Sequence, residues 1–273
     1  MPPPKEFRTY CQLYNEWKEE EGGNMYKNLR EKMVQLIRDA KEAYVLTGAG
    51  MSTESGIPDF RSPQTGLWEN VDPMKTSTVD VLMSDPEHFY RVGFKRFASL
   101  LEAEPNPGHY ALAEMESLDL IKGVITQNID SLHKRAGTRK VYEVHGHVRT
   151  CHCLACKKMY QMQEILDQIE AEIIPPRCKK CSSVLRPDIV LFGDSMPVDF
   201  YQAMGIVEKS CDLLLVVGSS LAVYPVATLP TMVEKLAIVN LEPTPFDSLA
   251  EVVIQEKSSK VLSDVLAGLK NQS

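Results

Sequence analysis

The sequence lacks the features that mark several large classes of protein. No stretch approaches the roughly 18 consecutive apolar residues that a membrane-spanning helix needs. Its first residues, MPPPKEFRTYCQLYNEWKEEEGG, are charged and contain no apolar core of a secretory signal. Basic residues are not in excess, since 30 lysines and arginines stand against 37 acidic residues and leave a net charge of −7. We therefore expect a cytoplasmic protein with no membrane partner and no direct nucleic-acid partner, because its overall field repels phosphate.

Disulfide bonds are also not expected, although the chain has seven cysteines, because it carries no export signal. Four cysteines form two CxxC pairs: Cys153 with Cys156, and Cys178 with Cys181. Each pair directs two thiolates at one point, and two pairs complete the tetrahedral sulfur site that zinc prefers. Cys151 and His152 are possible competing ligands, but the two regular pairs are the simpler set. Four protein ligands leave no open position, so the sequence predicts one structural zinc ion.

Short apolar runs alternate along the chain with segments of helical periodicity. The runs are expected to be strands at 43–47, 120–126, 141–144, 188–192, 212–217 and 236–241. The expected helices are 26–40, 85–102, 107–118, 162–172 and 198–209. This alternation is typical of a parallel sheet with helices on both faces, so we predict an α/β fold with a Rossmann-like sheet and a small inserted zinc-ribbon domain.

The cysteine-rich segment interrupts this alternation and indicates where the domains divide. We expect a zinc-binding small domain at residues 150–187, inserted into a Rossmann-like domain formed by residues 25–149 and 188–273. Residues 1–24 are polar and end near a Gly-Gly break, so they are expected to form an N-terminal arm.

Polar or glycine-containing segments follow the expected strands. They are Thr47-Gly48, Thr126-Gln127-Asn128, Phe192-Gly193-Asp194, Gly218-Ser219-Ser220 and Asn240. Because the carboxyl ends of parallel strands meet at one edge of a sheet, we expect these segments to converge on one cleft.

Gly48-Ala49-Gly50 follows the first expected strand and allows a backbone to approach phosphate closely. A helix starting near Met51 would add its N-terminal N–H groups. An ordinary strand-to-helix turn explains the same glycines, however, and Thr53 stands where a dinucleotide fingerprint has its third glycine.

Two further segments carry side chains suited to chemistry. Residues 126–133, TQNIDSLH, place more polar side chains at a strand end than helix capping needs. His145 follows the expected strand 141–144, beside Gly146. A histidine with an ordinary pKa of about 6.5 is suited to accept a proton at neutral pH.

These segments resemble, in order, the sirtuins, a family of NAD-dependent protein deacylases. The matching blocks are GAGMSTESGIPDFRS (48–62), TQNIDSLH (126–133), His145-Gly146, the two cysteine pairs, RPDIVLFGD (186–194), GSSLAVYP (218–225) and VN (239–240). They lie within about residues 43–242 and resemble a bacterial-type member with a single catalytic core. The resemblance implies NAD as cofactor, and an acylated-lysine protein or peptide as the partner and substrate.

The resemblance also implies a role for individual residues. His145 and Asn128 are the implied catalytic residues, with His145 as the base. The implied edges that hold the substrate peptide as a third strand are Phe192, Gly193, Asp194 and Val223. The implied NAD-binding residues are Gly48, Ala49, Gly50, Ser52, Thr53, Phe60, Arg61, Gln127, Asn128, Ile129, Asp130, His145, Gly218, Ser219, Ser220, Asn240 and Leu241.

The implied reaction is a displacement and not a hydride transfer. The acyl oxygen attacks C1′ of the nicotinamide ribose, and the products are nicotinamide, free lysine and O-acyl-ADP-ribose. Asp130 and the Ile129 N–H would hold the carboxamide, Phe60 would cover the sugar, and Arg61 would pair with phosphate. Two alternatives stay open: mono-ADP-ribosyl transfer at the same NAD site, and a non-catalytic zinc-ribbon binding module.

Three positions depart from patterns common in the family. Asp194 stands where Glu is common, and Ser62 stands where Gly is common. Sirtuins that prefer succinyl groups carry a Tyr-x-x-Arg pair, whereas here Gly93 precedes Arg96. A succinyl carboxylate would lose one of its two partners, so we expect an acetyl or a longer apolar acyl group.

Overall fold

The computed structural model describes residues 23–59, 72–94 and 98–271 of the chain. Residues 1–22 of the expected N-terminal arm lie outside this part, and residues 23–39 are helical. Within the described residues, none of the helices combines the length and the apolar character that crossing a bilayer requires.

A six-stranded parallel sheet forms the larger body of the protein, with the strand order β3-β2-β1-β7-β8-β9. Its strands are β1 (Ala43–Thr47), β2 (Gly123–Thr126), β3 (Val141–Glu143), β7 (Leu213–Val217), β8 (Lys235–Val239) and β9 (Val252–Ile254). All residues of β1, β2 and β7 are buried, as expected for strands covered on both faces. The order changes direction between β1 and β7, which is where open α/β sheets bind ligands.

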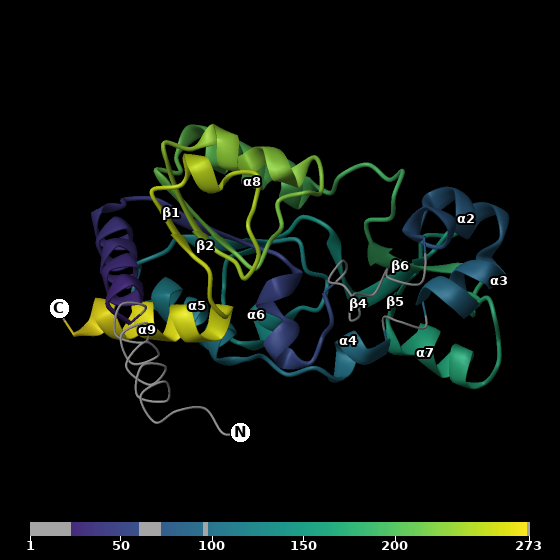
Figure 1. Ribbon diagram of the computed structural model, residues 1–273. Helices are drawn as coiled ribbons and strands as arrows, with labels where there is room; N and C mark the ends of the chain where they lie inside the picture. Colours follow the sequence, from purple (N-terminus) through teal and green to yellow (C-terminus); the bar gives the residue numbers. More distant parts are fainter. Residues whose placement is uncertain (1–22, 60–71, 95–97, 272–273) are drawn as a thin grey trace, which may run out of the picture.

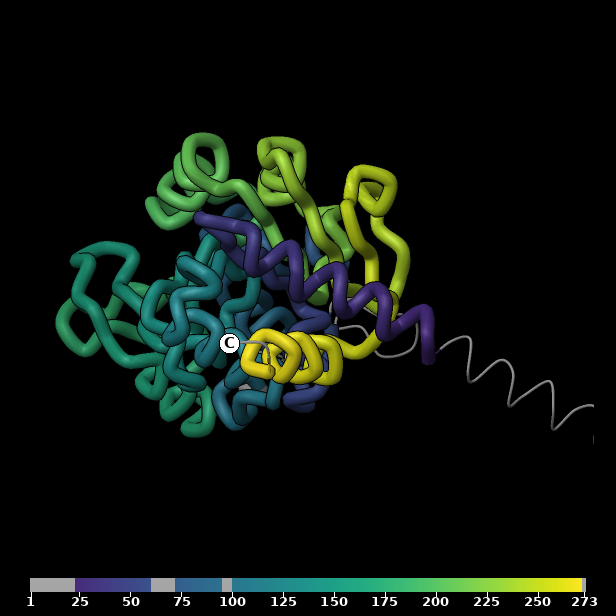
Figure 2. Tube along the Cα trace, turned by 90° about the vertical axis from the view of Figure 1, so that its left-hand side faces the viewer, coloured from purple at the N-terminus to yellow at the C-terminus, as the bar shows by residue number. Residues whose placement is uncertain are grey.

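Side chains along the central strands alternate between two hydrophobic clusters, one on each face of the sheet. Val45 belongs to the cluster formed with the helix 23–39, α5 (Pro107–Ser117) and α9 (Ser258–Lys270). Leu46 belongs to the other cluster, formed with α8 (Val198–Lys209). Figure 1 shows α8 on one side of the strands and α5 and α9 on the other. The helix 23–39 and α9 lie side by side in Figure 2, and Arg38 Nη2 donates to the Leu269 carbonyl (2.8 Å).

A second, three-stranded antiparallel sheet has the order β5-β4-β6. Its elements are β4 (Gly146–Cys153), β5 (Met159–Gln161) and β6 (Leu185–Ile189), with α7 (Gln163–Glu170) beside them. Its hydrophobic cluster also takes in Leu82 and Phe89, which precede the segment 150–187. Tyr90 Oη donates to the Leu185 carbonyl (2.5 Å). The segment that contains α2 (Val79–Ser84), α3 (Pro86–His88) and α4 (Ala98–Glu102) therefore contributes to this core. The division into domains by residue ranges stays a prediction.

Two expected elements are wrong. The run 188–192 is not a strand of the parallel sheet, because β6 ends at Ile189 and pairs antiparallel with β4. A short apolar run fits either kind of sheet, and its partner strand decides between them. Two 3₁₀ turns, Ala49–Met51 and Thr53–Ser55, replace the helix expected near Met51. The expected helix 85–102 is helical from Pro86 on throughout its described residues, since α3 continues into a π-helical turn at Phe89–Gly93 and α4 ends at Glu102, and residues 95–97 lie outside the described part.

The other expected elements agree with the structure to within three residues at their ends, and α8 has the expected bounds. Sequence reasoning missed β4, β5, β9, α2 and α9. The remaining elements are α6 (Leu132–Arg135) and short 3₁₀ turns at Pro73–Lys75, Val226–Met232 and Asp247–Leu249.

Candidate functional site

A cavity of about 730 Å³ opens where β1, β2, β7 and β8 end. Its wall contains these residues of the predicted site: Gly48, Ala49, Gly50, Thr53, Gln127, Asn128, Ile129, His145, Phe192, Gly193, Asp194, Gly218, Ser219, Ser220, Val223, Asn240 and Leu241. Ser52 and Asp130 are not part of this wall and are buried. Phe60 and Arg61 lie outside the described residues, as does Arg96.

Three glycines allow the ends of β1 and β7 to lie in direct contact. The Gly50 N–H donates to the Gly218 carbonyl (2.8 Å). A Cβ on Gly50 would lie 2.9 Å from Gly218 Cα, and one on Gly48 would lie 2.8 Å from the Gly218 carbonyl oxygen. Gly218 has a φ of +61°, and a Cβ there would lie 2.2 Å from the Met51 nitrogen. Side chains at these positions would separate the two strand ends, so the glycines keep bare backbone at the cavity wall.

The residues after β2 form a connected set of hydrogen bonds beneath the cavity. Asn128 Nδ2 donates to the Gly48 carbonyl and to Ser52 Oγ, each at 3.0 Å. Ser52 Oγ donates to Asp130 Oδ2 (2.7 Å), and the Leu132 N–H donates to Asp130 Oδ1 (2.9 Å). Burial raises the pKa of Asp130, although these two hydrogen bonds oppose the rise. The amide of Asn128 is therefore fixed in orientation where it faces the cavity.

His145 follows the end of β3, and its hydrogen bond determines which of its two ring nitrogens carries the proton. Its Nδ1 lies 3.0 Å from the Gln127 carbonyl oxygen. A carbonyl oxygen only accepts, so Nδ1 carries the proton and Nε2 keeps its lone pair. Burial lowers the pKa of His145, and the hydrogen bond to Gln127 only partly offsets this. The imidazole is therefore neutral at pH 7 and lines the cavity as a potential base.

The chain turns sharply after His145 because of Gly146. This glycine has a φ of +75°, and a Cβ on it would lie 2.2 Å from the Asp188 carbonyl oxygen. Only glycine fits this position without moving β6. The pairing of Gly146 with Ile189 of β6 therefore also fixes the position of His145, the residue before it.

The four cysteines of the two CxxC pairs form one cluster, with all their sulfur atoms within 4.8 Å of one another. Cys153 Sγ lies 3.4 Å from Cys181 Sγ, and Cys156 Sγ lies 3.7 Å from Cys178 Sγ. These distances exceed the ~2.05 Å of a disulfide bond. They are close to the ~3.8 Å between ligands of a tetrahedral zinc with bonds of ~2.3 Å. The donor set and its geometry fit one structural zinc ion.

The two possible competing ligands have other partners. Cys151 Sγ donates to the Gln161 carbonyl (3.6 Å). His152 Nδ1 lies 2.6 Å from Asp188 Oδ1. Among the described residues, neither belongs to the sulfur cluster, and none of the four clustered cysteines lines the cavity.

Phe192 and Asp194, two of the residues expected to hold the peptide, line the cavity, and much of their polar capacity is already used. The Phe192 N–H donates to the Ser77 carbonyl (3.1 Å), and the Val79 N–H donates to the Phe192 carbonyl (3.0 Å). The Asp194 carboxylate accepts from the Leu191 N–H (2.8 Å) and is paired with Arg186. The backbone of Phe192 is therefore bound to residues 77–79, and the Asp194 side chain turns toward its own segment.

Sequence reasoning missed part of the wall, including Glu54, Glu242, Lys257 and Ser258. Lys257 and Ser258 lie where α9 begins, and Glu54 Oε2 accepts from the Ser259 N–H (3.0 Å). Apolar residues at helical spacing after position 260 would have located α9 and thereby this side of the cavity.

Comparison with known proteins assigns the chain to a family. The model of the Sir2 family matches residues 48–225, which is more than half of the chain. This chain therefore belongs to the Sir2 family, and the resemblance to sirtuins is confirmed.

Two curated relatives illustrate the similarity. The protein named NAD-dependent protein deacetylase 2 of Caldanaerobacter subterraneus subsp. tengcongensis is 54% identical over 239 residues, covering 88% of this chain and 95% of that protein. The NAD-dependent protein deacetylase of Thermotoga maritima is 42% identical over 225 residues, covering 81% and 90%.

Solved structures agree with this assignment. One described as Sir2 with a p53 peptide and NAD+ has a TM-score of 0.79 and 38% identity, and covers 89% of this chain and 98% of that one. A structure of Sir2Tm bound to a propionylated peptide has a TM-score of 0.78 and 38% identity, with coverages of 88% and 98%.

Proposed function

We propose that this chain is an NAD-dependent protein lysine deacylase, which releases nicotinamide and O-acyl-ADP-ribose. The observation that carries the proposal is the neutral His145 in the wall of a cavity at the strand ends, in a chain of the Sir2 family. Relatives in this family are named as NAD-dependent deacetylases and deacylases. A neutral imidazole with a free Nε2 supplies the base that the implied reaction needs.

NAD is the cofactor whose chemistry suits this cavity. When bound, NAD supplies an activated ribose carbon that the acyl oxygen of the substrate attacks. The cavity volume of about 730 Å³ lies within the usual range for a ligand site. The bare backbone of Gly48, Gly50 and Gly218 would lie against the phosphates, and Asn240 and Leu241 against the adenosine half.

The residues near His145 have distinct tasks in this proposal. His145 accepts a proton from a ribose hydroxyl at Nε2, while the Gln127 carbonyl keeps the ring in the required tautomer. Asn128 faces the same cavity, and its fixed amide orients the reacting groups. The Ile129 N–H and Asp130 would hold the carboxamide of nicotinamide. Ile129 lines the cavity, whereas Asp130 is buried outside its wall. Each Asp130 oxygen can accept one more hydrogen bond beside those from Ser52 and Leu132. The zinc ion is structural, since its four cysteines leave no open position.

Gly93 carries the proposal on acyl preference. A Cβ at this position would lie 2.5 Å from the Thr76 carbonyl oxygen, so the local packing requires a glycine. A tyrosine that would bind a succinyl carboxylate is therefore excluded here. We expect acetyl-peptide and longer apolar acyl-peptides to react faster than a succinyl-peptide of the same sequence, and a faster succinyl reaction would contradict this.

The function is tested by measuring nicotinamide release from NAD with and without an acetylated lysine peptide. We expect release that depends on the acetyl group and matches the amount of O-acetyl-ADP-ribose formed. With labelled NAD, label that stays on protein would favour the alternative of mono-ADP-ribosyl transfer. No release under any condition would favour the alternative of a non-catalytic binding module.

A cytoplasmic location of this chain is also part of the proposal.

A further inference from the structure

An ion pair between a buried carboxylate and a partly exposed arginine lies close in sequence to residues that face the cavity, and the reaction outlined above does not use it. Glu143 ends β3, two residues before His145, and its side chain is only 5% exposed. Arg149 comes from β4 and binds this carboxylate with both terminal nitrogens, with Nη2 at 2.6 Å from Oε2. Two parallel hydrogen bonds of this kind fix the plane of the guanidinium group.

The same guanidinium group also holds Ser131. Arg149 Nη1 donates to Ser131 Oγ at 2.6 Å. Ser131 has a φ of +66° and a ψ of 13°, a left-handed conformation that is costly for a residue with a Cβ. This residue separates Asp130 from Leu132, whose N–H binds the Asp130 carboxylate. The conformation of Ser131 therefore sets the direction of the Asp130 side chain.

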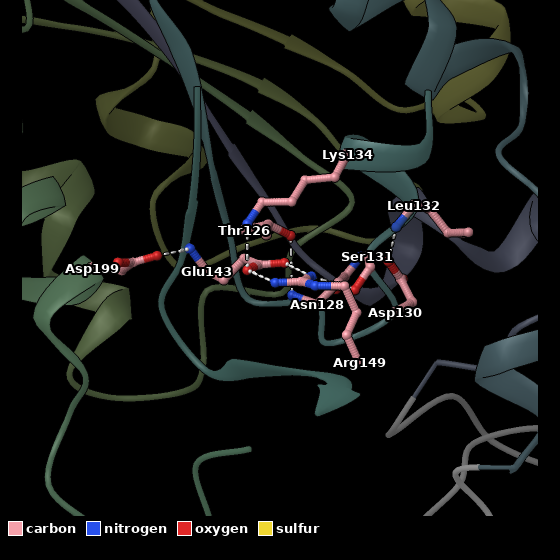
Figure 3. Close-up of polar contacts among 9 residues, drawn as sticks. All are labelled: Thr126, Asn128, Asp130, Ser131, Leu132, Lys134, Glu143, Arg149 and Asp199. Atoms are coloured by element: carbon pink, nitrogen blue, oxygen red, sulfur yellow. Dashed lines mark hydrogen bonds and ion pairs between the residues drawn. The ribbon is translucent and has the colours of Figure 1, made fainter. Parts of the chain in front are cut away.

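Figure 3 shows how the other groups are arranged. Lys134 and Arg149 approach the Glu143 carboxylate from opposite sides, and Lys134 Nζ lies 2.8 Å from Glu143 Oε2. The Glu143 N–H donates to Asp199 Oδ2 (2.8 Å) on the far side. Burial by itself would raise the pKa of Glu143, but the hydrogen bonds from Arg149 and Lys134 outweigh it and hold that pKa below its ordinary value. The carboxylate is thus a fixed anchor, and among the residues drawn only Arg149 connects it to Ser131.

The strand that carries Arg149 belongs to the three-stranded sheet. β4 also carries Cys153 of the zinc cluster, and its pairing with β6 shifts register between Gly146 and Cys151. The Val148 N–H donates to the Ile129 carbonyl (3.0 Å), one residue before Asp130. β4 is therefore bound to the residues after β2 at two points, through Val148 and through Arg149.

We propose that Arg149 is a positioning residue for the nicotinamide end of the cavity. Anchored on Glu143, it holds Ser131 in the left-handed conformation and so keeps the Asp130 carboxylate and the Ile129 N–H in the orientation that binds a carboxamide. The proposal rests on the proposed function, because it concerns the same site. It makes the three-stranded sheet a support for the nicotinamide end.

The test compares kinetic constants of Arg149→Ala with those of the wild-type chain. We expect the KM for NAD, and the nicotinamide concentration that halves the rate, each to rise about tenfold, which corresponds to ~1.4 kcal/mol. The KM for the acetylated peptide should stay unchanged, because the residues expected to hold the peptide (192–194 and Val223) belong to other segments than Ser131. Arg149→Lys retains the charge but loses the bidentate geometry, so we expect an intermediate effect.

Two substitutions of Ser131 separate positioning from simple stability. Ser131→Ala keeps the ion pair of Arg149 with Glu143 and removes only the hydroxyl, so we expect a smaller shift of the same two constants. Ser131→Gly reaches the left-handed region without strain. Added to Arg149→Ala, it should restore most of the lost affinity for nicotinamide. If the ion pair served only stability, Ser131→Gly would not restore this affinity.

Arg139→Ala is the matched control. Arg139 Nε lies 3.7 Å from the buried carboxylate of Glu116, and neither residue lines the cavity. This control should leave all the constants unchanged.

The outcomes are distinct. An active Arg149→Ala chain with unchanged NAD and nicotinamide constants, an equal rise in the peptide KM, or no rescue by Ser131→Gly would overturn the inference while leaving the proposed function intact. If Arg149→Ala does not fold, unchanged constants in Ser131→Ala would overturn it instead. A wild-type chain without peptide-dependent nicotinamide release would overturn the proposed function itself, and the inference with it.

Discussion

The two sheets of this protein keep their structure by different means. In the six-stranded sheet, every residue of β1, β2 and β7 is buried, and apolar clusters cover both faces. In the three-stranded sheet, β4 buries three of its eight residues and β5 buries none. The large sheet therefore relies on apolar burial, and the small sheet needs the four cysteines and their metal ion in addition.

This difference predicts that separate agents disrupt the two parts. Removing the metal should act on the small sheet first, whereas charging buried groups should act on the large one. His145 lies where the two parts meet, between β3 and β4, so its loss should affect the reaction and neither fold.

The largest expected effect is loss of zinc from Cys153→Ala. Cys153 is buried and its sulfur lies 3.4 Å from that of Cys181, so three thiolates cannot complete the site. Binding of a structural zinc ion is worth ~10–16 kcal/mol in small zinc domains, which makes it a large part of their folding free energy. We expect metal analysis to fall from one zinc ion per chain to none, with proteolysis beginning within residues 150–187.

Cys151→Ala provides the matched control for this prediction. Cys151 is as buried as Cys153 and lies two residues away on the same strand, but it is outside the sulfur cluster. The control should keep one zinc ion per chain. Retention of the metal in Cys153→Ala would show that the ligand set is wrong.

The metal cluster was predictable from the sequence because CxxC spacing is local and each pair sets its own geometry. The strand ends at Gly48, Asn128 and Gly218 were predictable for a related reason, since parallel strands bring their carboxyl ends to one edge. The run 188–192 was assigned to the wrong sheet because its partner, β4, is distant in sequence. The contact of Arg149 with Ser131 was beyond reach, because it depends on a left-handed residue and on a shift in strand register.

The second effect in size concerns His145→Ala. Removing a general base lowers a rate by about 10²- to 10⁴-fold. NAD binding should remain close to that of the wild-type chain, because His145 is one of many residues around the cavity. Peptide deacetylation and NAD titration measure the two properties separately, and normal turnover in this variant would remove His145 from its assigned role.

The smallest effect is a dependence of stability on pH that arises beside the six-stranded sheet, where His133 Nε2 lies 2.9 Å from Thr47 Oγ1 of β1. His109 and His133 are buried there with ring centroids 4.8 Å apart. Burial lowers the pKa of His109 to about 4, and burial together with the neighbouring His109 lowers the pKa of His133 well below its ordinary value. The unfolded chain binds these protons near pH 6.5, so the free energy of unfolding falls as pH falls from about 6.5 toward about 4, by up to ~1.4 kcal/mol per pH unit for each histidine.

Urea unfolding at several pH values between about 7.5 and 5 measures this slope. His109→Gln removes one titrating group, so its stability should vary less steeply with pH below 6.5 than that of the wild-type chain. His88→Gln is the matched control, because His88 is exposed at the end of α3 and its loss should leave the slope unchanged. Zinc content should stay constant over the same range if acid acts first on the large sheet. Zinc that is released at a higher pH than the one at which the chain loses its far-UV circular dichroism would contradict the contrast between the two sheets. The small sheet would then be the more sensitive to acid.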